Sequence, residues 1–315
     1  MSWTAADIPD QTGRVAVVTG GNGGLGLETA RALVAHGAQV IMAARDQDKA
    51  AAAVTDIRTG VPLASVEVRP LDLSSLASIR LFAEQLVQQH PRIDLLINNA
   101  GVMGIPERQT VDGFEMQFGV NHLGHFALTA LLLPSLLRVD AARIVNVTST
   151  GRHTGRPLDP ANPHLRGRYT PWGAYGQSKL ANVHFTLGLQ QRFEAAGSGA
   201  SSLVAHPGMA HTDLQPNSVR ETGGGRSQRF FAWQAARTGM SPSRGALPQL
   251  RAATDPRARG GELYTPRFIN FGTPVRRPLL TRTRNQEAIN TLWEVSEQET
   301  GFSLDVASTQ STVRP

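Results

Sequence analysis

Through the first two thirds of the chain, short apolar runs rich in β-branched residues alternate with stretches in which apolar positions recur every three to four residues. The runs predict strands and the stretches predict helices. The expected strands are 14–19, 39–44, 64–69, 92–97, 143–148 and 201–205. The helices expected between them are 25–36, 46–58, a third after Ser74, a fourth over about 113–137, and 174–195. Such alternation builds a parallel sheet through right-handed crossovers.

The expected strands are apolar throughout instead of alternating, which indicates a sheet covered on both faces. We therefore predict an α/β fold, a doubly wound parallel sheet of the Rossmann type with six to seven strands and helices on both faces. Polar residues mark two of the helix starts. Ser74 is expected to cap the third helix, and Asp112 with Glu115 the fourth.

A single catalytic domain is expected over 14–302, between an N-terminal arm at 1–13 and a flexible tail at 303–315. Two long stretches depart from the strand–helix pattern. The first, 151–173, is rich in Gly, Pro and Arg, and the second, 213–240, contains Phe230, Phe231, Trp233 and Met240. Both follow strands, at the sheet edge where ligands bind in such folds, so we expect both to be substrate loops.

The composition excludes several classes of protein. The chain has 315 residues, 40% hydrophobic and 18% charged, which argues against a disordered chain. Cysteine is absent, which excludes disulfides, thiolate metal sites and a cysteine nucleophile. The N-terminus lacks the pattern of a signal peptide, and the longest apolar run, 126–137, is too short to span a bilayer. A soluble cytoplasmic protein without an integral membrane segment is expected.

The net charge is +6, and nearly all of the positive charge is arginine, because Lys49 and Lys179 are the only lysines. One basic cluster near the C-terminus comprises Arg276, Arg277, Arg282 and Arg284. It could attract an acidic partner or a membrane surface, but a solvated surface is favoured. No basic stripe carries interleaved aromatics, so no nucleic-acid partner is expected. Several histidines flank motif positions without acidic residues at metal-ligand spacing, and we expect packing or loop roles and no metal site for His122, His125, His206 and His211.

A glycine-rich turn, TGGNGGLG at 19–26, follows the first expected strand and opens the first helix. Gly21, Gly23 and Gly26 satisfy the pattern G-x-G-x-x-G. Glycine lets the backbone approach a pyrophosphate closely, and the helix start presents free N–H groups and a positive dipole end to it. Because the motif lies between a strand and a helix, it predicts dinucleotide binding.

The end of the second strand indicates which dinucleotide binds. An NAD-binding chain usually places an acidic residue there to hold the ribose hydroxyls. Asp46 has about the right spacing, but it is better explained as the cap of the next helix. The strand tip ends in Ala44 and Arg45, and a guanidinium suits a phosphate. We therefore predict NADP(H).

Tyr175 and Lys179 stand four residues apart in YGQSK, on an expected helix, so they share one face. The alternative is a surface tyrosine beside a solvated lysine. A free tyrosine has a pKa of about 10, and acid–base work near neutrality asks for about three units less. A neighbouring ammonium has the right sign to lower the pKa of the phenol.

Together these motifs resemble the short-chain dehydrogenase/reductase family over about residues 13–213. The further members of the set are Asp72-Leu73, Asn98-Asn99-Ala100-Gly101, Asn121, Ser149, and Pro207-Gly208 followed by Thr212. The strings AYGQSKLAN, HPGMAHTDL and FGVNHLGHF, and the long interval between Ser149 and Tyr175, resemble the retinol-dehydrogenase-like branch.

The resemblance implies a catalytic set of Ser149, Tyr175, Lys179 and Asn121. Tyr175 would donate or remove the hydroxyl proton, and Lys179 would lower the pKa of that phenol and bind the nicotinamide ribose. Ser149 would hydrogen-bond the substrate oxygen, and Asn121 would hold a water or serve as a buried structural amide. The implied cofactor-binding residues are Gly20, Asn22, Gly24, Leu25, Gly26, Arg45, Asp72, Leu73, Asn99, Ala100, Gly101, Tyr175, Lys179, Pro207, Gly208 and Thr212.

The resulting hypothesis is an NADP(H)-dependent oxidoreductase that transfers a hydride between nicotinamide and the carbonyl or hydroxyl carbon of a lipophilic ketone, aldehyde or alcohol. The alternative is a non-catalytic NADP(H)-binding regulator or sensor, against which the complete Ser-Tyr-Lys-Asn set argues. The resemblance also implies a homodimer or homotetramer, paired through the helices at 113–137 and 174–195.

Overall fold

A computed structural model describes residues 2–210 and 239–313. An eight-stranded sheet forms its centre, with the strand order β3-β2-β1-β4-β5-β6-β7-β8. The strands are β1 (Val15–Thr19), β2 (Gln39–Ala44), β3 (Val66–Pro70), β4 (Leu95–Asn98), β5 (Arg143–Val147), β6 (Ser201–Ala205), β7 (Leu263–Pro266) and β8 (Pro274–Arg277). Neighbours from β3 to β7 pair in parallel, and β8 pairs with β7 antiparallel.

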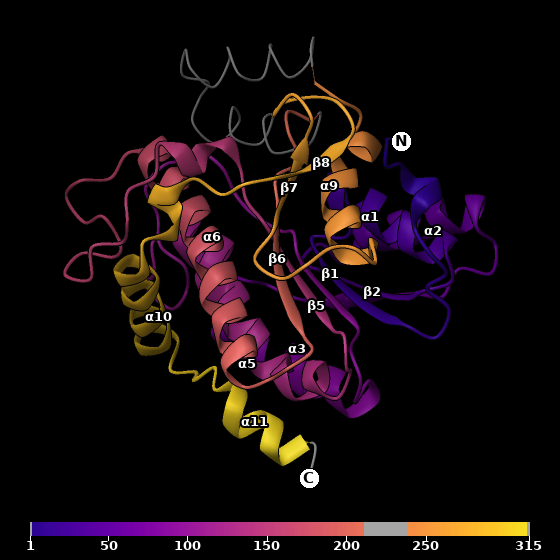
Figure 1. Ribbon diagram of the computed structural model, residues 1–315, viewed down its shortest axis with the longest axis horizontal. Coiled ribbons are helices and arrows are strands. Elements are labelled where there is room, and N and C mark those ends of the chain that lie inside the picture. The colour runs from indigo at the N-terminus through magenta and orange to yellow at the C-terminus, as the bar shows by residue number, and fades with distance from the viewer. Residues whose placement is uncertain (1, 211–238, 314–315) are drawn as a thin grey trace.

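Helices cover both faces of the sheet (Figure 1). One face carries α1 (Gly24–Ala35), α2 (Gln47–Gly60) and α9 (Pro242–Thr254), and the other carries α3 (Leu76–Gln89), α5 (Gly124–Leu137) and α6 (Pro171–Ala195). Short helical segments are η1 (Ala5–Asp7), α4 (Met116–Phe118), the π-helical turn η2 (Gly119–Leu123), η3 (Thr150–His153) and η4 (Thr281–Arg284). The predicted doubly wound α/β fold is confirmed. The strand number was predicted too low, because the sheet has eight strands and the last one is antiparallel.

Two of the expected helix caps are wrong by small shifts. Ser75, not Ser74, caps α3 by accepting the Ser78 N–H, while Ser74 bonds the carboxylate of Asp72. The fourth helix begins at α4, and the Glu115 carboxylate caps it by accepting from the N–H groups of Gln117 and Phe118. Its expected partner Asp112 instead accepts the Leu76 N–H at the start of α3.

The C-terminal residues are not a loose tail. After α10 (Gln286–Thr300), the side chains of Leu304 and Val306 are buried in the core on the α5 side of the sheet, 1% and 2% exposed. The last helix, α11 (Val306–Val313), packs on α5 and α6, and α10 packs on α6. This end of the chain therefore belongs to the folded domain, which the polar sequence of 303–315 did not indicate.

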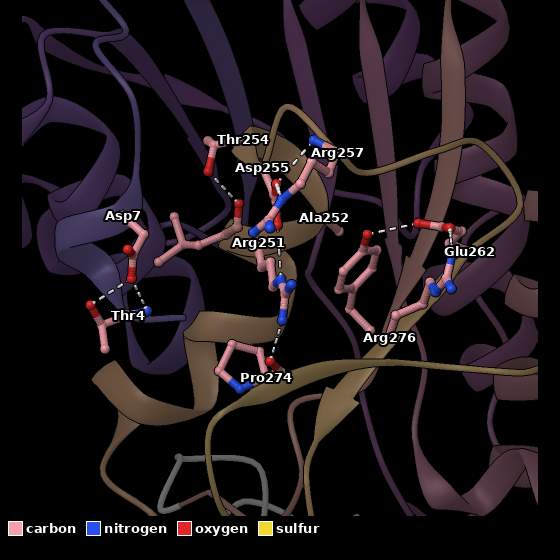
Figure 2. Close-up of polar contacts among 12 residues, drawn as sticks. Thr4, Asp7, Arg251, Ala252, Thr254, Asp255, Arg257, Glu262, Pro274 and Arg276 are labelled. Carbon is pink, nitrogen blue, oxygen red and sulfur yellow. Dashed lines mark hydrogen bonds and ion pairs between the residues drawn. The ribbon is translucent and has the colours of Figure 1, made fainter. Parts of the chain in front are cut away.

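A polar network ties α9 to the sheet edge formed by β7 and β8 (Figure 2). Arg251 on α9 pairs with Asp255 at 3.0 Å and donates to the Pro274 carbonyl at 2.6 Å. Just before β7, the Glu262 carboxylate accepts from the Tyr264 hydroxyl at 2.7 Å and from Arg276 of β8 at 2.8 Å. Arg276, part of the basic cluster seen in the sequence, is thus half of an ion pair with Glu262.

Among the described helices, one continuous stretch, Met116–Leu137, is long and apolar enough to cross a membrane by length and composition alone. It comprises α4, η2 and α5. Within its most apolar window, 78% of the residues are buried inside the protein. The stretch therefore serves as a core helix against the sheet in this structure.

Candidate active site

A cleft of about 740 Å³ opens above the carboxyl ends of the strands, where the strand order reverses between β1 and β4. Most of the predicted site residues line it. These are Gly20, Asn22, Gly24, Leu25, Arg45, Asp72, Leu73, Asn99, Ala100, Gly101, Ser149, Tyr175, Lys179, Pro207 and Gly208. Gly26 and Asn121 lie beneath this lining, and the predicted Thr212 falls outside the described residues.

The glycine turn is built so that only glycine fits at its closest points. Gly20 has φ of 65°, in the left-handed region that favours glycine. A Cβ on Gly26 would lie 2.2 Å from the Gly20 carbonyl oxygen and 2.7 Å from the Asn99 amide nitrogen. The turn therefore folds back on itself and directs the N-terminus of α1 into the cleft, which fits an anionic phosphate group.

The far end of the cleft, beyond the glycine turn, is lined by Arg45, Asp46 and Lys49. Asp46 caps α2 by accepting the Lys49 N–H at 2.9 Å, so the predicted cap is confirmed. Ala44, at the tip of β2, carries no charge, and Arg45 beside it is exposed. The Asp46 carboxylate thus caps a helix, while the Arg45 guanidinium stands at the cleft.

Hydrogen bonds to Thr19 fix the backbone that lines the middle of the cleft. The Thr19 hydroxyl, at the end of β1, accepts from the N–H groups of Asn99 at 2.9 Å and Ala100 at 3.0 Å. The Asn99 side chain donates to the Thr19 carbonyl at 2.9 Å. The segment after β4 is therefore fastened to the strand that carries the glycine turn.

Asn121 is fully buried beneath this segment. Its amide oxygen accepts the Val102 N–H at 2.8 Å, and its amide nitrogen donates to the Val102 carbonyl and the Ser178 hydroxyl, each at 2.9 Å. A Cβ on Gly101 would lie 2.8 Å from the Asn121 side-chain oxygen and 3.3 Å from Lys179 Nζ. These contacts match the alternative of a buried amide that fixes the backbone.

Tyr175 and Ser149 come together at the edge of β5. Ser149 is the N-cap of η3, and its hydroxyl accepts the Gly151 N–H at 3.2 Å. A Cβ on Gly151 would lie 2.9 Å from the Tyr175 ring, so the glycine lets the ring approach. Burial raises the pKa of Tyr175 to about 12, against a smaller lowering by its hydrogen bond to Ser149. The lowered pKa expected from the sequence is therefore not found, because burial dominates.

Lys179 lies one turn further along α6, and its side chain is buried. Its ammonium donates to the Val147 carbonyl at 3.2 Å and stands 5.8 Å from the centre of the Tyr175 ring. Burial lowers its pKa to about 8. Within the described part of the chain the ammonium forms no ion pair, so its charge is directed at the cleft without a protein counter-ion.

The sequence did not identify the apolar end of the cleft. Met103, Ile105, Met116 and Val120 line it, beside Arg108. The expected loop 151–173 contributes no lining residue. Met240 is buried beside Ala210, which lines the cleft, but does not line it itself. The remainder of the second expected loop, with Phe230, Phe231 and Trp233, lies outside the described residues. Met116 and Val120 stand four apart just before Asn121, which is the signal that could have revealed this wall.

The comparison with protein-family models decides the family. The model of the short chain dehydrogenases matches residues 14–223, which is more than half of the chain. The chain belongs to the short-chain dehydrogenase family. As a short-chain dehydrogenase it is an oxidoreductase, and the family implies an NAD(P)(H) cofactor, which the narrow glycine turn and the cleft lining fit.

Individual short-chain dehydrogenases resemble this one over most of its length. Human retinol dehydrogenase 12 is 39% identical over 90% of this chain and 85% of its own, and mouse polyprenol dehydrogenase is 39% identical over 93% and 86%. The match to human retinol dehydrogenase 13 is 47% identical but spans 66% of this chain and 62% of that protein. A crystal structure of an uncharacterised protein from Mycobacterium paratuberculosis has a TM-score of 0.80 at 41% identity, covering 96% of this chain and 99% of that one.

Proposed function

We propose that this short-chain dehydrogenase interconverts lipophilic alcohols with their aldehydes or ketones and uses NADP(H). The observation that carries the proposal is a cleft lined both by a buried tyrosine, hydrogen-bonded to a serine, and by apolar side chains that include Met103, Ile105 and Met116. The names of the relatives, retinol and polyprenol dehydrogenases, support a lipophilic substrate.

In this proposal the bound nicotinamide supplies or accepts the hydride at the substrate carbon. During reduction, the Tyr175 hydroxyl donates its proton to the carbonyl oxygen, and the product is the alcohol. The Ser149 hydroxyl donates a hydrogen bond to the same oxygen, where negative charge develops. The Lys179 ammonium stabilises the phenolate that remains until a proton from solvent replaces the one transferred. In oxidation each step reverses, and Tyr175 removes the hydroxyl proton.

The preference for NADP(H) rests on the far end of the cleft. Arg45 is exposed there, and the nearby Asp46 carboxylate already accepts a backbone hydrogen bond. A planar guanidinium suits the 2′-phosphate that distinguishes NADP(H) from NAD(H).

The purified chain should oxidise NADPH in the presence of all-trans-retinal or a medium-chain aldehyde, followed as loss of absorbance. We expect kcat/KM for NADPH to exceed that for NADH at least tenfold, and Arg45→Asp to reverse the preference. Tyr175→Phe should lower kcat at least about a hundredfold while the Kd for NADPH stays within threefold. Equal use of NADH would refute the cofactor assignment. Turnover by Tyr175→Phe close to the wild-type rate would refute the acid–base role, and NADPH binding by the wild type without turnover of any carbonyl substrate would favour the sensor.

A further inference from the structure

A buried histidine connects two parts of the candidate site that lie in separate sequence motifs, the end of β1 and the turn that carries Asn121. His125 is the second residue of α5 and is 2% exposed. Its Nε2 lies 2.9 Å from the Thr19 hydroxyl oxygen, and its Nδ1 lies 3.1 Å from the Asn121 carbonyl oxygen. The ring thus spans from the end of β1 to the π-helical turn that carries Asn121.

The neighbours determine which ring nitrogen carries the proton. The Asn121 carbonyl can only accept, so His125 Nδ1 is the donor to it. The Thr19 hydroxyl oxygen already accepts from Asn99 and Ala100, so its own hydrogen is directed elsewhere, and His125 Nε2 at 2.9 Å is a closer acceptor than the Ile97 carbonyl at 3.3 Å. Burial lowers the pKa of His125 to about 4, and the nearby Lys179 charge acts in the same direction. The ring is therefore neutral, with its proton on Nδ1.

The network continues on both sides of the ring. On the β1 side, the Thr19 hydroxyl holds the backbone of Asn99 and Ala100, which lines the cleft. On the other side, the Asn121 side chain bonds the Ser178 hydroxyl, which in turn donates to the Tyr175 carbonyl at 2.9 Å. These parts lie close together. A Cβ atom added to Gly101 would lie only 2.8 Å from the Asn121 side-chain oxygen and 3.3 Å from Lys179 Nζ.

We propose that His125 is a positioning residue that sets the register between the segment Asn99–Gly101, which lines the cleft, and Asn121, which bonds α6 through Ser178. Its ring touches neither the cleft lining nor the reacting atoms, and it acts through Thr19 and Asn121. The effect on turnover rests on the proposed function. The tautomer and the register do not, because they follow from the hydrogen bonds alone.

A second histidine on the same stretch provides a matched control. His122 is 1% exposed, and its Nε2 bonds the Ser296 hydroxyl on α10 at 2.7 Å. Its ring packs among the rings of Phe118, Phe126 and Phe185, away from Thr19. A role limited to packing would give the two histidines the same response to substitution.

The first test compares His125→Leu, His125→Gln and His122→Leu in the full chain. The Gln side-chain oxygen can take the place of Nε2 and accept from Thr19, whereas Leu removes both hydrogen bonds. We expect His125→Leu to raise the Kd for NADPH, measured by fluorescence, at least fivefold and to lower kcat at least tenfold, with KM for the carbonyl substrate within twofold. His125→Gln should stay within threefold of the wild type. His122→Leu should lower Tm but leave the Kd and kcat within twofold.

Two further measurements keep the proposal testable if His125→Leu folds poorly. Thr19→Val keeps the shape of the side chain and removes the hydroxyl to which His125 bonds. It should by itself raise the Kd for NADPH at least fivefold, whereas His125→Gln, which keeps the contact, should not. In a long-range ¹H–¹⁵N spectrum of the ligand-free chain, the imidazole signals that disappear in His125→Gln should be those of a neutral ring with its proton on Nδ1 at pH 5 to 8.

An Nε2-protonated or charged ring would overturn the proposal, as would a His125→Leu variant that binds NADPH like the wild type. A Thr19→Val variant that binds NADPH like the wild type would overturn it as well. If the wild type binds neither NADPH nor NADH, the proposed function fails, and the spectrum still tests the hydrogen-bond register on its own.

Discussion

At the scale of single residues, the site combines a phenol and an ammonium whose proton affinities are both changed by burial. The pKa of Tyr175 is raised to about 12 and that of Lys179 is lowered to about 8. Burial disfavours whichever form is charged, so it acts in opposite directions on an acid and on a base. At neutral pH, Tyr175 therefore holds its proton and Lys179 remains a cation, which is the pair of states that carbonyl reduction needs.

The two pKa values predict opposite pH dependences for the two directions. Above about pH 8 Lys179 loses its proton, so we expect kcat for NADPH-dependent reduction to fall as pH rises through that range. Oxidation needs the Tyr175 phenolate, so its rate should rise with pH. Measuring kcat in both directions from pH 5.5 to 10 tests this. A reduction rate that keeps climbing above pH 9 contradicts it.

Sequence reasoning performed well for residues whose role depends on a local pattern. Asp46 is the helix cap that its spacing predicts, and Tyr175 and Lys179 do share one face of α6. It failed where the partner is distant in the chain. Asp112 bonds the Leu76 N–H across 36 positions, and no local pattern indicates that contact. The raised pKa of Tyr175 likewise depends on burial, which spacing does not report.

At the scale of elements, the turn between β1 and α1 tolerates no side chain at Gly26. The added Cβ would lie 2.2 Å from the Gly20 carbonyl oxygen, so something in the turn must shift. We expect Gly26→Ala to weaken NADPH binding more than tenfold and to lower Tm. At Gly60, the last residue of α2, nothing lies within 4 Å of an added Cβ, and its φ is not in the left-handed region.

Gly60→Ala is therefore the control, with NADPH binding unchanged and stability equal or about 0.5–1 kcal/mol higher. The measurements are fluorescence titration with NADPH and thermal unfolding. Unchanged binding by Gly26→Ala would show that the turn does not hold the phosphates.

Up to residue 205, element boundaries were predictable to within a few residues, but no helix or strand beyond it was anticipated, and neither was the π-helical turn. The strand β8 follows a turn through the exposed Phe268 and Phe271, and its sequence PVRR lacks the apolar run that marks the buried strands. The π-helical turn at Gly119–Leu123 interrupts what the pattern predicts as one helix. An edge strand and a local helix defect both depend on tertiary neighbours, and neither changes the apolar periodicity.

At the scale of the whole molecule, the C-terminal residues complete the core. Leu304 is 1% exposed, and replacing a fully buried leucine by alanine costs about 2–5 kcal/mol. We expect Leu304→Ala to lower the free energy of unfolding by that amount in a urea titration. Leu63, which is 97% exposed, supplies the control, because Leu63→Ala should change it by less than about 0.5 kcal/mol. If the two substitutions lowered the free energy of unfolding equally, residues 303–315 would be a loose tail as the sequence predicted.

The resemblance implies that two copies of the chain pair through the fourth and fifth predicted helices, which end as α5 and α6 in the structure. α5 exposes only Pro134, and α6 is covered by α10 and α11 along much of its length. In this structure the C-terminal helices α10 and α11 therefore already lie against part of the helices through which pairing is implied.

The placement of α10 and α11 therefore has a practical consequence for anyone who shortens this chain. Removing everything from residue 286 onward would bare the leucine- and phenylalanine-rich flank formed by α5 and α6. Such a fragment would be expected to precipitate or to self-associate. Any oligomer observed for it would result from the truncation and would not describe the full chain.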